Sequence, residues 1–265
     1  MKDFFMHEGG KTMYIVFLVV LLIPFIVMIV MNALEKKTED VVVTEKTQCK
    51  NYVLGITLLW GVTLLIFIMC YIGKISLEDI GFRPIKFNYN IWFTIITLVV
   101  SGIALIYFIY QLIASLGSSR FIEKQMADSN QGTIGVLPRT KKEKCLFSLL
   151  ALSAGICEEV IFRGFLIFLV LAIFPNAPIY LVILISTLIF GIAHAYQGLQ
   201  GVISTGLLAI MFMCLFLVTD CLIFAILLHF IIDFSATFIL SEKNMVDSKT
   251  ENPDSNKEIR REIWK

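Results

Sequence analysis

Charged residues are scarce in this sequence of 265 residues: they make up 16% of it, against roughly 25% in soluble domains. Apolar residues reach 58%, and the mean hydropathy is +0.84. This composition excludes an ordinary soluble globular protein. The net charge of +1 also provides no basic surface for a polyanion, so no nucleic-acid partner is expected.

Two further patterns are absent. The six cysteines lack the close paired spacings of a zinc knot or a redox motif, so they are interpreted as small packing residues within apolar segments. No internal repeat is visible between the two halves of the chain, which disfavours a transporter built from inverted repeats.

Long apolar runs dominate what is present. A bilayer core of roughly 30 Å requires about 20 apolar residues in a helix. Seven runs approach that length: 14–33, 52–72, 91–114, 146–171, 179–196, 199–218 and 221–240. The sequence therefore predicts an all-α, polytopic integral membrane bundle with about seven transmembrane helices, with the lipid bilayer as its partner.

The basic residues predict an orientation. Sixteen of the 22 Lys and Arg residues lie in 34–51, in 115–145 and in the tail after residue 240. With seven spans these segments share one face, which the positive-inside rule assigns to the cytoplasm. We therefore expect a multi-pass protein of the cell membrane with a cytoplasmic C-terminus and an N-terminus outside.

Ionisable residues inside the predicted spans occur only in the later ones. A charge at the bilayer centre costs about 2.5–3.5 kcal/mol on insertion scales, so such residues are candidates for function. The first three spans contain none, and the later ones contain six: Glu158, Glu159, Arg163, His194, His229 and Asp233.

Helical spacing predicts how these residues pair. Residues four apart share a helix face, so Glu159 can pair with Arg163, and His229 with Asp233. Glu158 is rotated by about 100° from its neighbour and can face a cavity as a general base. Small residues that let membrane helices approach closely flank the cluster: Ala151, Ala154, Gly155, Gly164, Gly191, Ala195, Gly198, Gly201 and Gly206.

Three segments carry recognisable motifs: AGICEEVIFRGFL, FGIAHAYQG and LLHFIID. They resemble the Glu-Glu-x-x-x-Arg, Phe-x-x-x-His and His-x-x-x-Asn/Asp motifs of the CPBP intramembrane proteases. That family includes Rce1-type CAAX prenyl proteases and bacterial Abi proteins of bacteriocin immunity. LEDIGF at 77–82 and LPRTKKEK at 137–144 are also similar to bacterial members.

The resemblance suggests a division of the chain into three parts. Residues 1–137 would form N-terminal transmembrane helices and loops, residues 138–240 a catalytic helical core, and residues 241–265 a polar cytoplasmic tail.

The resemblance also implies roles for the six residues. Glu158 and His194 would activate a water molecule, and His229 and Asp233 would stabilise the oxyanion or the substrate carbonyl. Glu159 and Arg163 would be supporting. Asp233 stands where the prenyl proteases are expected to have asparagine. Because a carboxylate is a poor donor to an oxyanion, its expected task is to orient His229.

A mechanism without a cofactor is the favoured hypothesis, since no His-Glu-x-x-His helix is present. The alternative is zinc held by His194, His229 and Glu158 with an open fourth position.

The predicted function is an intramembrane endopeptidase acting on a membrane-associated peptide or protein, in peptide maturation or bacteriocin self-immunity. Whether that substrate is prenylated stays open. Two other functions also remain open: a non-catalytic membrane binding or immunity scaffold, and a proton-coupled transporter that uses the same residues as a relay.

Overall fold

A computed structural model describes residues 8–35, 44–118, 121–122, 124–125 and 135–239. Throughout these ranges the regular structure is helical, which confirms the predicted all-α class. The predicted cytoplasmic tail, 241–265, lies outside the described residues, and so does part of the predicted loop 115–145.

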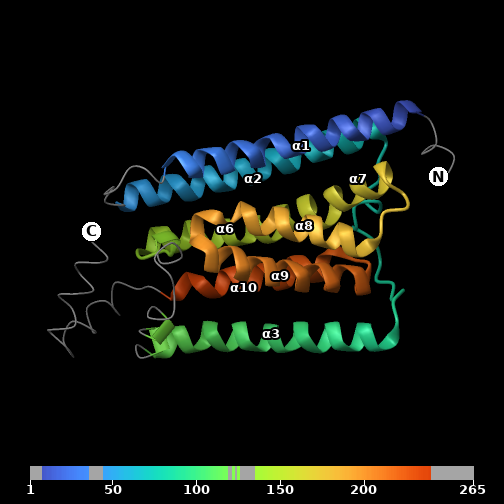
Figure 1. Cartoon of the computed structure of the whole chain (residues 1–265). Helices are drawn as coiled ribbons and strands as arrows, with labels where there is room; N and C mark the ends of the chain where they lie inside the picture. The colour runs from blue at the N-terminus through green and yellow to red at the C-terminus, as the bar shows by residue number, and fades with distance from the viewer. Residues whose placement is uncertain (1–7, 36–43, 119–120, 123, 126–134, 240–265) are drawn as a thin grey trace.

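The helices run nearly parallel as one bundle (Figure 1). α1 and α2 lie along one side, α3 lies along the opposite side, and α6, α8, α9 and α10 lie between them. A π-helix, η2, joins α6 to α7 without a break. The bounds are α1 (Glu8–Glu35), α2 (Glu45–Gly73), α3 (Ile91–Gly117), α6 (Lys141–Glu159), η2 (Val160–Phe165), α7 (Leu166–Ile173), α8 (Ile179–Ala193), η3 (Ala195–Gln197), α9 (Gly198–Thr219), α10 (Leu222–Ser235) and η4 (Ala236–Phe238).

Among the described residues, three helices are long and apolar enough to cross a membrane: 45–73, 91–117 and 195–219. Shorter apolar helices cover 10–24, 179–193 and 222–238. The predicted span 179–196 was too long, because α8 has 15 residues. The predicted span 221–240 contains α10, which has 14 residues, and η4, which continues to Phe238. α8 ends where the chain turns at His194, and α9 begins at Gly198, whose φ is +81°.

α3 shows how the bundle meets its surroundings. Its buried residues are all polar, namely Thr94, Thr97, Ser101, Gln111 and Ser115, whereas its exposed face carries large apolar side chains such as Ile103 and Ile106. Water would destabilise such an outward apolar surface, and lipid accommodates it. The exposed surface of this helix therefore agrees with a membrane environment.

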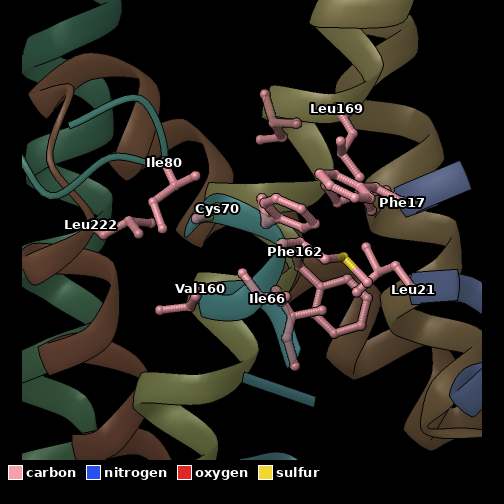
Figure 2. Packing of buried hydrophobic residues seen from close by; sticks show 14 of the residues in the cluster. Phe17, Leu21, Ile66, Cys70, Ile80, Val160, Phe162, Leu169 and Leu222 are labelled. Carbon is pink, nitrogen blue, oxygen red and sulfur yellow. The ribbon is translucent and has the colours of Figure 1, made fainter. Parts of the chain in front are cut away.

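The main hydrophobic core joins the N-terminal helices to the later ones (Figure 2). Its buried side chains come from α1, α2, α6, η2, α7, α8, α9 and the start of α10, and they include Phe17, Leu21, Ile66, Cys70, Val160, Phe162, Leu169 and Leu222. Ile80, from the connection between α2 and α3, is fully buried among them and approaches Leu222. The core thus fixes η2, which follows directly after Glu158 and Glu159.

Residues 76–86, the docking segment, pack against the turn between α9 and α10. Leu222 N–H donates to the Gly81 carbonyl at 3.0 Å, and Lys86 N–H donates to the Thr219 carbonyl at 3.0 Å. Arg83 pairs with Asp220, a contact that the sequence did not reveal.

Gly81 is required in this segment because its φ is +95°. A Cβ there would also lie 2.7 Å from the Phe216 ring.

Candidate active site

Two close helix approaches bring the site together. A Cβ on Gly155 would lie 3.0 Å from the backbone nitrogen of Phe230, so α6 and α10 nearly touch at that glycine. A Cβ on Gly191 would lie 3.1 Å from the carbonyl of Val202, which brings α8 against α9. The predicted role of small residues is confirmed at these two positions. One turn after Gly155, side chains from α6 and α10 can bond directly.

A buried ion pair forms the floor of the site. Arg163 Nη1 donates to Glu159 Oε1 at 2.9 Å, and the two side chains are 1% and 0% exposed. Arg163 Nη2 donates to the Ala209 carbonyl at 3.2 Å. The guanidinium carbon also lies 4.5 Å from the Phe190 ring centre and 5.3 Å from that of Phe212. The pairing predicted from the four-residue spacing is therefore present, in a fully enclosed form.

His229 links this ion pair to the rest of the site. Its Nδ1 lies 2.8 Å from Glu159 Oε1. The Arg163-paired carboxylate accepts, so Nδ1 is the donor in this bond. Its Nε2 lies 3.5 Å from Asp233 Oδ2 and 3.9 Å from Glu158 Oε2, and its ring stacks on Phe212 with centres 4.8 Å apart. Two neighbours, Glu159 and Phe212, therefore set the orientation of this imidazole.

This geometry differs from the prediction that Asp233 orients His229. The nearer carboxylate is Glu159, from another helix, while Asp233 lies at a distance longer than a good hydrogen bond. Spacing along α10 reveals the second contact but not the first, which depends on the close approach at Gly155.

His194 enters the site from the end of α8. Its Nδ1 lies 2.9 Å from the Phe190 carbonyl oxygen, which can only accept. Nδ1 therefore carries the proton, and in the neutral ring Nε2 keeps a lone pair. The ring lies 4.7 Å from that of Phe190, which itself lies 6.1 Å from the His229 ring. The imidazole thus has a defined tautomer and one nitrogen available for chemistry.

Glu158 makes the longest ion pair of the cluster, with its Oε2 3.9 Å from His229 Nε2. Its Oε2 is buried and has no hydrogen-bond partner among the described atoms. The side chain interacts electrostatically with His194, His229, Asp233 and Glu159. Buried polar atoms normally have a partner, and an ordered water or a substrate group often provides it. The structure therefore brings all six sequence-predicted residues into one cluster.

Comparison with known families agrees with this cluster. Residues 142–235 match the family described as type II CAAX prenyl endopeptidase Rce1-like. This region is an Rce1-like peptidase domain. All six site residues lie within it, and the family implies an intramembrane protease. No curated protein and no solved structure matches the chain.

The zinc site expected as the alternative needs a group of side chains that can hold a metal ion together. Among the residues that the structure describes, no group of three or more His, Cys, Asp or Glu side chains could hold a metal ion. In the alternative set of His194, His229 and Glu158, both Nδ1 atoms already have partners, which leaves the Nε2 atom of each ring. No chemical step is assigned to a metal.

Sequence reasoning missed the aromatic walls of the Rce1-like domain. Phe190 and Phe212 enclose Arg163 and contact His229. Phe190 could have been found, because it lies four residues before His194 in the second motif. Phe212 has no such signal. It is one of many aromatic residues on apolar helices, and only the packing of α9 against α10 gives it a role.

Proposed function

We propose that this protein is an intramembrane endopeptidase that hydrolyses a peptide bond in a membrane-associated peptide or protein. The observation that carries the proposal is the arrangement around Glu158. Its unpartnered, buried Oε2 faces His229 Nε2 in a domain that also holds His194 with an available Nε2. Glu158 Oε2 as proton acceptor, His194 Nε2 as second base and His229 Nε2 as donor thus surround a place for a water molecule.

The proposed step needs only these groups. Glu158, assisted by His194, takes a proton as the water oxygen bonds to the scissile carbonyl carbon. Protonated His229 Nε2 donates to the carbonyl oxygen as it becomes an oxyanion. The proton held by Glu158 then moves to the amide nitrogen, and the carbon–nitrogen bond breaks. Glu159 and Arg163 hold His229 in place throughout.

We also infer several passes of the chain through the cell membrane, with the C-terminus in the cytoplasm. Support comes from the three long apolar helices and from the Lys and Arg residues concentrated in 34–51, 115–145 and the tail. A reporter that is active only in the cytoplasm, fused after Lys265, should be active. An inactive reporter with intact expression would reverse the orientation.

The test of the function compares peptide termini in membrane and secreted fractions of cells. The cells would express the intact protein, Glu158→Gln, His194→Ala or the control Glu78→Gln at matched abundance. Glu78 is exposed on the docking segment, so its variant should retain activity. Specific termini should occur with the intact protein and the control, and be lost in both site variants.

The cut sequence would identify the substrate and show whether it is prenylated. Identical sets of termini in all four cultures would contradict the proposal. If a phenotype nevertheless persisted, a non-catalytic membrane binding or immunity scaffold would be the better account.

A further inference from the structure

The second motif, FGIAHAYQG, contains two polar residues that the proposed reaction does not use, Tyr196 and Gln197. Both belong to η3, the short turn that joins α8 to α9 directly after His194. The rings of His194 and Tyr196 lie 6.0 Å apart at an angle of 31°. Because Tyr196 is 42% exposed, a substrate that reaches His194 can also contact this side chain.

The hydroxyl of Tyr196 is held by its neighbour in the motif. Gln197 Nε2 donates to Tyr196 Oη at 3.0 Å. Since the phenol oxygen accepts in this bond, its own proton remains available for an acceptor. A Cβ on Gly201 would lie 2.3 Å from Gln197 Cβ and 3.0 Å from Gln197 Oε1. The glycine therefore leaves the space in which the glutamine side chain lies.

Electrostatic interactions connect Tyr196 to the carboxylates of the site. Tyr196 interacts with Glu158 and with Asp233, and the same two carboxylates lie 3.9 Å and 3.5 Å from His229 Nε2. Tyr196 on η3 and His229 on α10 thus border the same pair of groups. A substrate carbonyl that lies against His229 Nε2 therefore lies near the Tyr196 side chain as well.

The proposed reaction gives the oxyanion one donor, His229 Nε2. The nearby carboxylates of Glu158 and Asp233 only accept hydrogen bonds when they are ionised. Arg163 is 1% exposed and lies beneath the site, away from an incoming substrate. Oxyanion sites of acyl transfer combine several donors aimed at the developing charge. The Tyr196 hydroxyl has the chemistry and the exposure to be a second one.

We propose that Tyr196 is a further catalytic residue of the endopeptidase reaction proposed above, whose hydroxyl donates a hydrogen bond to the carbonyl oxygen as it becomes an oxyanion. This role rests on that reaction and adds one group to it. The phenol keeps its proton throughout, so the proton transfers between water, Glu158 and the amide nitrogen are unchanged. Gln197 is a positioning residue that acts through the phenol oxygen.

The test measures cleavage by the purified full-length protein in phosphatidylcholine vesicles, with a peptide that spans the cut sequence found in cells. Tyr196→Phe removes the hydroxyl and keeps the ring. Tyr180→Phe is the matched control, because Tyr180 is 66% exposed at the opposite end of α8. We expect kcat to fall about 100-fold with Tyr196→Phe and to be unchanged with Tyr180→Phe.

Binding measurements separate a bond to the oxyanion from a structural role. Glu158→Gln protein should bind the peptide without cutting it, and adding Tyr196→Phe should leave the Kd within about threefold. The second probe is a phosphinate analogue of the peptide, with a tetrahedral anionic group in place of the scissile amide. It should bind Tyr196→Phe about 100-fold more weakly than the wild type.

Gln197 provides a second way to test the hydroxyl. Gln197→Met removes the bond to the phenol oxygen and should lower kcat about 10-fold at an unchanged Kd. Combined with Tyr196→Phe it should cause no further loss, because both changes act through one hydroxyl. If Tyr196→Phe does not fold, Gln197→Met decides the question: a lower kcat at the same Kd supports the role, and an unchanged kcat overturns it.

The outcomes distinguish this role from the proposed function. A kcat of folded Tyr196→Phe within about threefold of the wild type would overturn the role of Tyr196 and leave the proposed function standing. Equal losses of affinity for the peptide and for the phosphinate would also overturn it. If the wild type cuts no peptide, the proposed function and the role of Tyr196 both fail.

Discussion

The described part of the chain contains two arginine–carboxylate pairs in very different surroundings. Glu159 and Arg163 are 0% and 1% exposed and are enclosed by aromatic rings, a carbonyl and an imidazole. Arg83 and Asp220 are 34% and 24% exposed and join the docking segment to the turn before α10. The chemistry is the same, but the inner pair has no water to replace a lost partner. Burial therefore decides what each pair contributes.

Breaking the inner pair, Glu159–Arg163, should have the largest effect on stability and on cleavage. Arg163→Ala leaves Glu159 buried without its cation and should lower the free energy of unfolding by about 3–5 kcal/mol. Peptide cleavage should also be lost, because Arg163 no longer holds Glu159 in the position from which it orients His229. Thermal unfolding in detergent and a cleavage assay measure the two effects.

A double variant sharpens this result. Arg163→Met with Glu159→Gln removes both charges, and buried pairs replaced in this way often keep their stability. We expect recovery of most of the unfolding free energy without recovery of cleavage. If the unfolding free energy of Arg163→Ala lies within about 1 kcal/mol of that of the wild type, the description of this pair as enclosed is contradicted.

The docking segment should be the next most sensitive. Gly81→Ala places a Cβ against Phe216 at a backbone φ of +95° and should cost about 1–3 kcal/mol. The measurement is the unfolding temperature in matched lipid. Gly102→Ala is the control, because nothing lies within 4 Å of a Cβ there. It should retain or slightly raise stability. Equal losses in both variants would argue against close packing at Gly81.

Removing an aromatic wall should have a smaller effect. Phe212→Leu removes the ring that stacks on His229 and faces Arg163, so it should cost about 1–2 kcal/mol of stability. Cleavage should fall further than it does in Phe108→Leu, the same change on α3 away from the site. If the two variants cleave equally, Phe212 does not position the imidazole.

The outer pair, Arg83–Asp220, should contribute least to stability. Arg83→Ala should change the unfolding free energy by about 1 kcal/mol or less, and the difference should shrink further at high salt. Lys86→Ala is the matched control, because the bond of Lys86 to Thr219 uses its backbone. A loss as large as that of Arg163→Ala would remove the distinction between the two pairs.

The sequence alone revealed those parts of the site that depend on spacing within one helix. Four-residue spacing gave the Glu159–Arg163 pair, and the scarcity of charge in the apolar runs marked all six cluster residues. Glycine in α6 indicated a close approach, although not which helix would approach.

Contacts between distant segments could not be predicted in the same way. The Glu159–His229 bond depends on how α6 and α10 pack, and the Arg83–Asp220 pair depends on the path of the docking segment. Hydropathy also misjudged the end of α8. The predicted span continued to residue 196, whereas the helix ends at Ala193 and the chain turns at His194.

The most direct test of the central claim is hydrolysis by the purified protein in lipid vesicles prepared in ¹⁸O-labelled water, using the substrate whose termini were found in cells. We predict that the new C-terminal carboxylate carries ¹⁸O with the wild type and that no such product forms with folded Glu158→Gln protein. Labelled product formed equally well by Glu158→Gln, or no cleavage by the wild type, would contradict the assignment of Glu158 as the base that activates water.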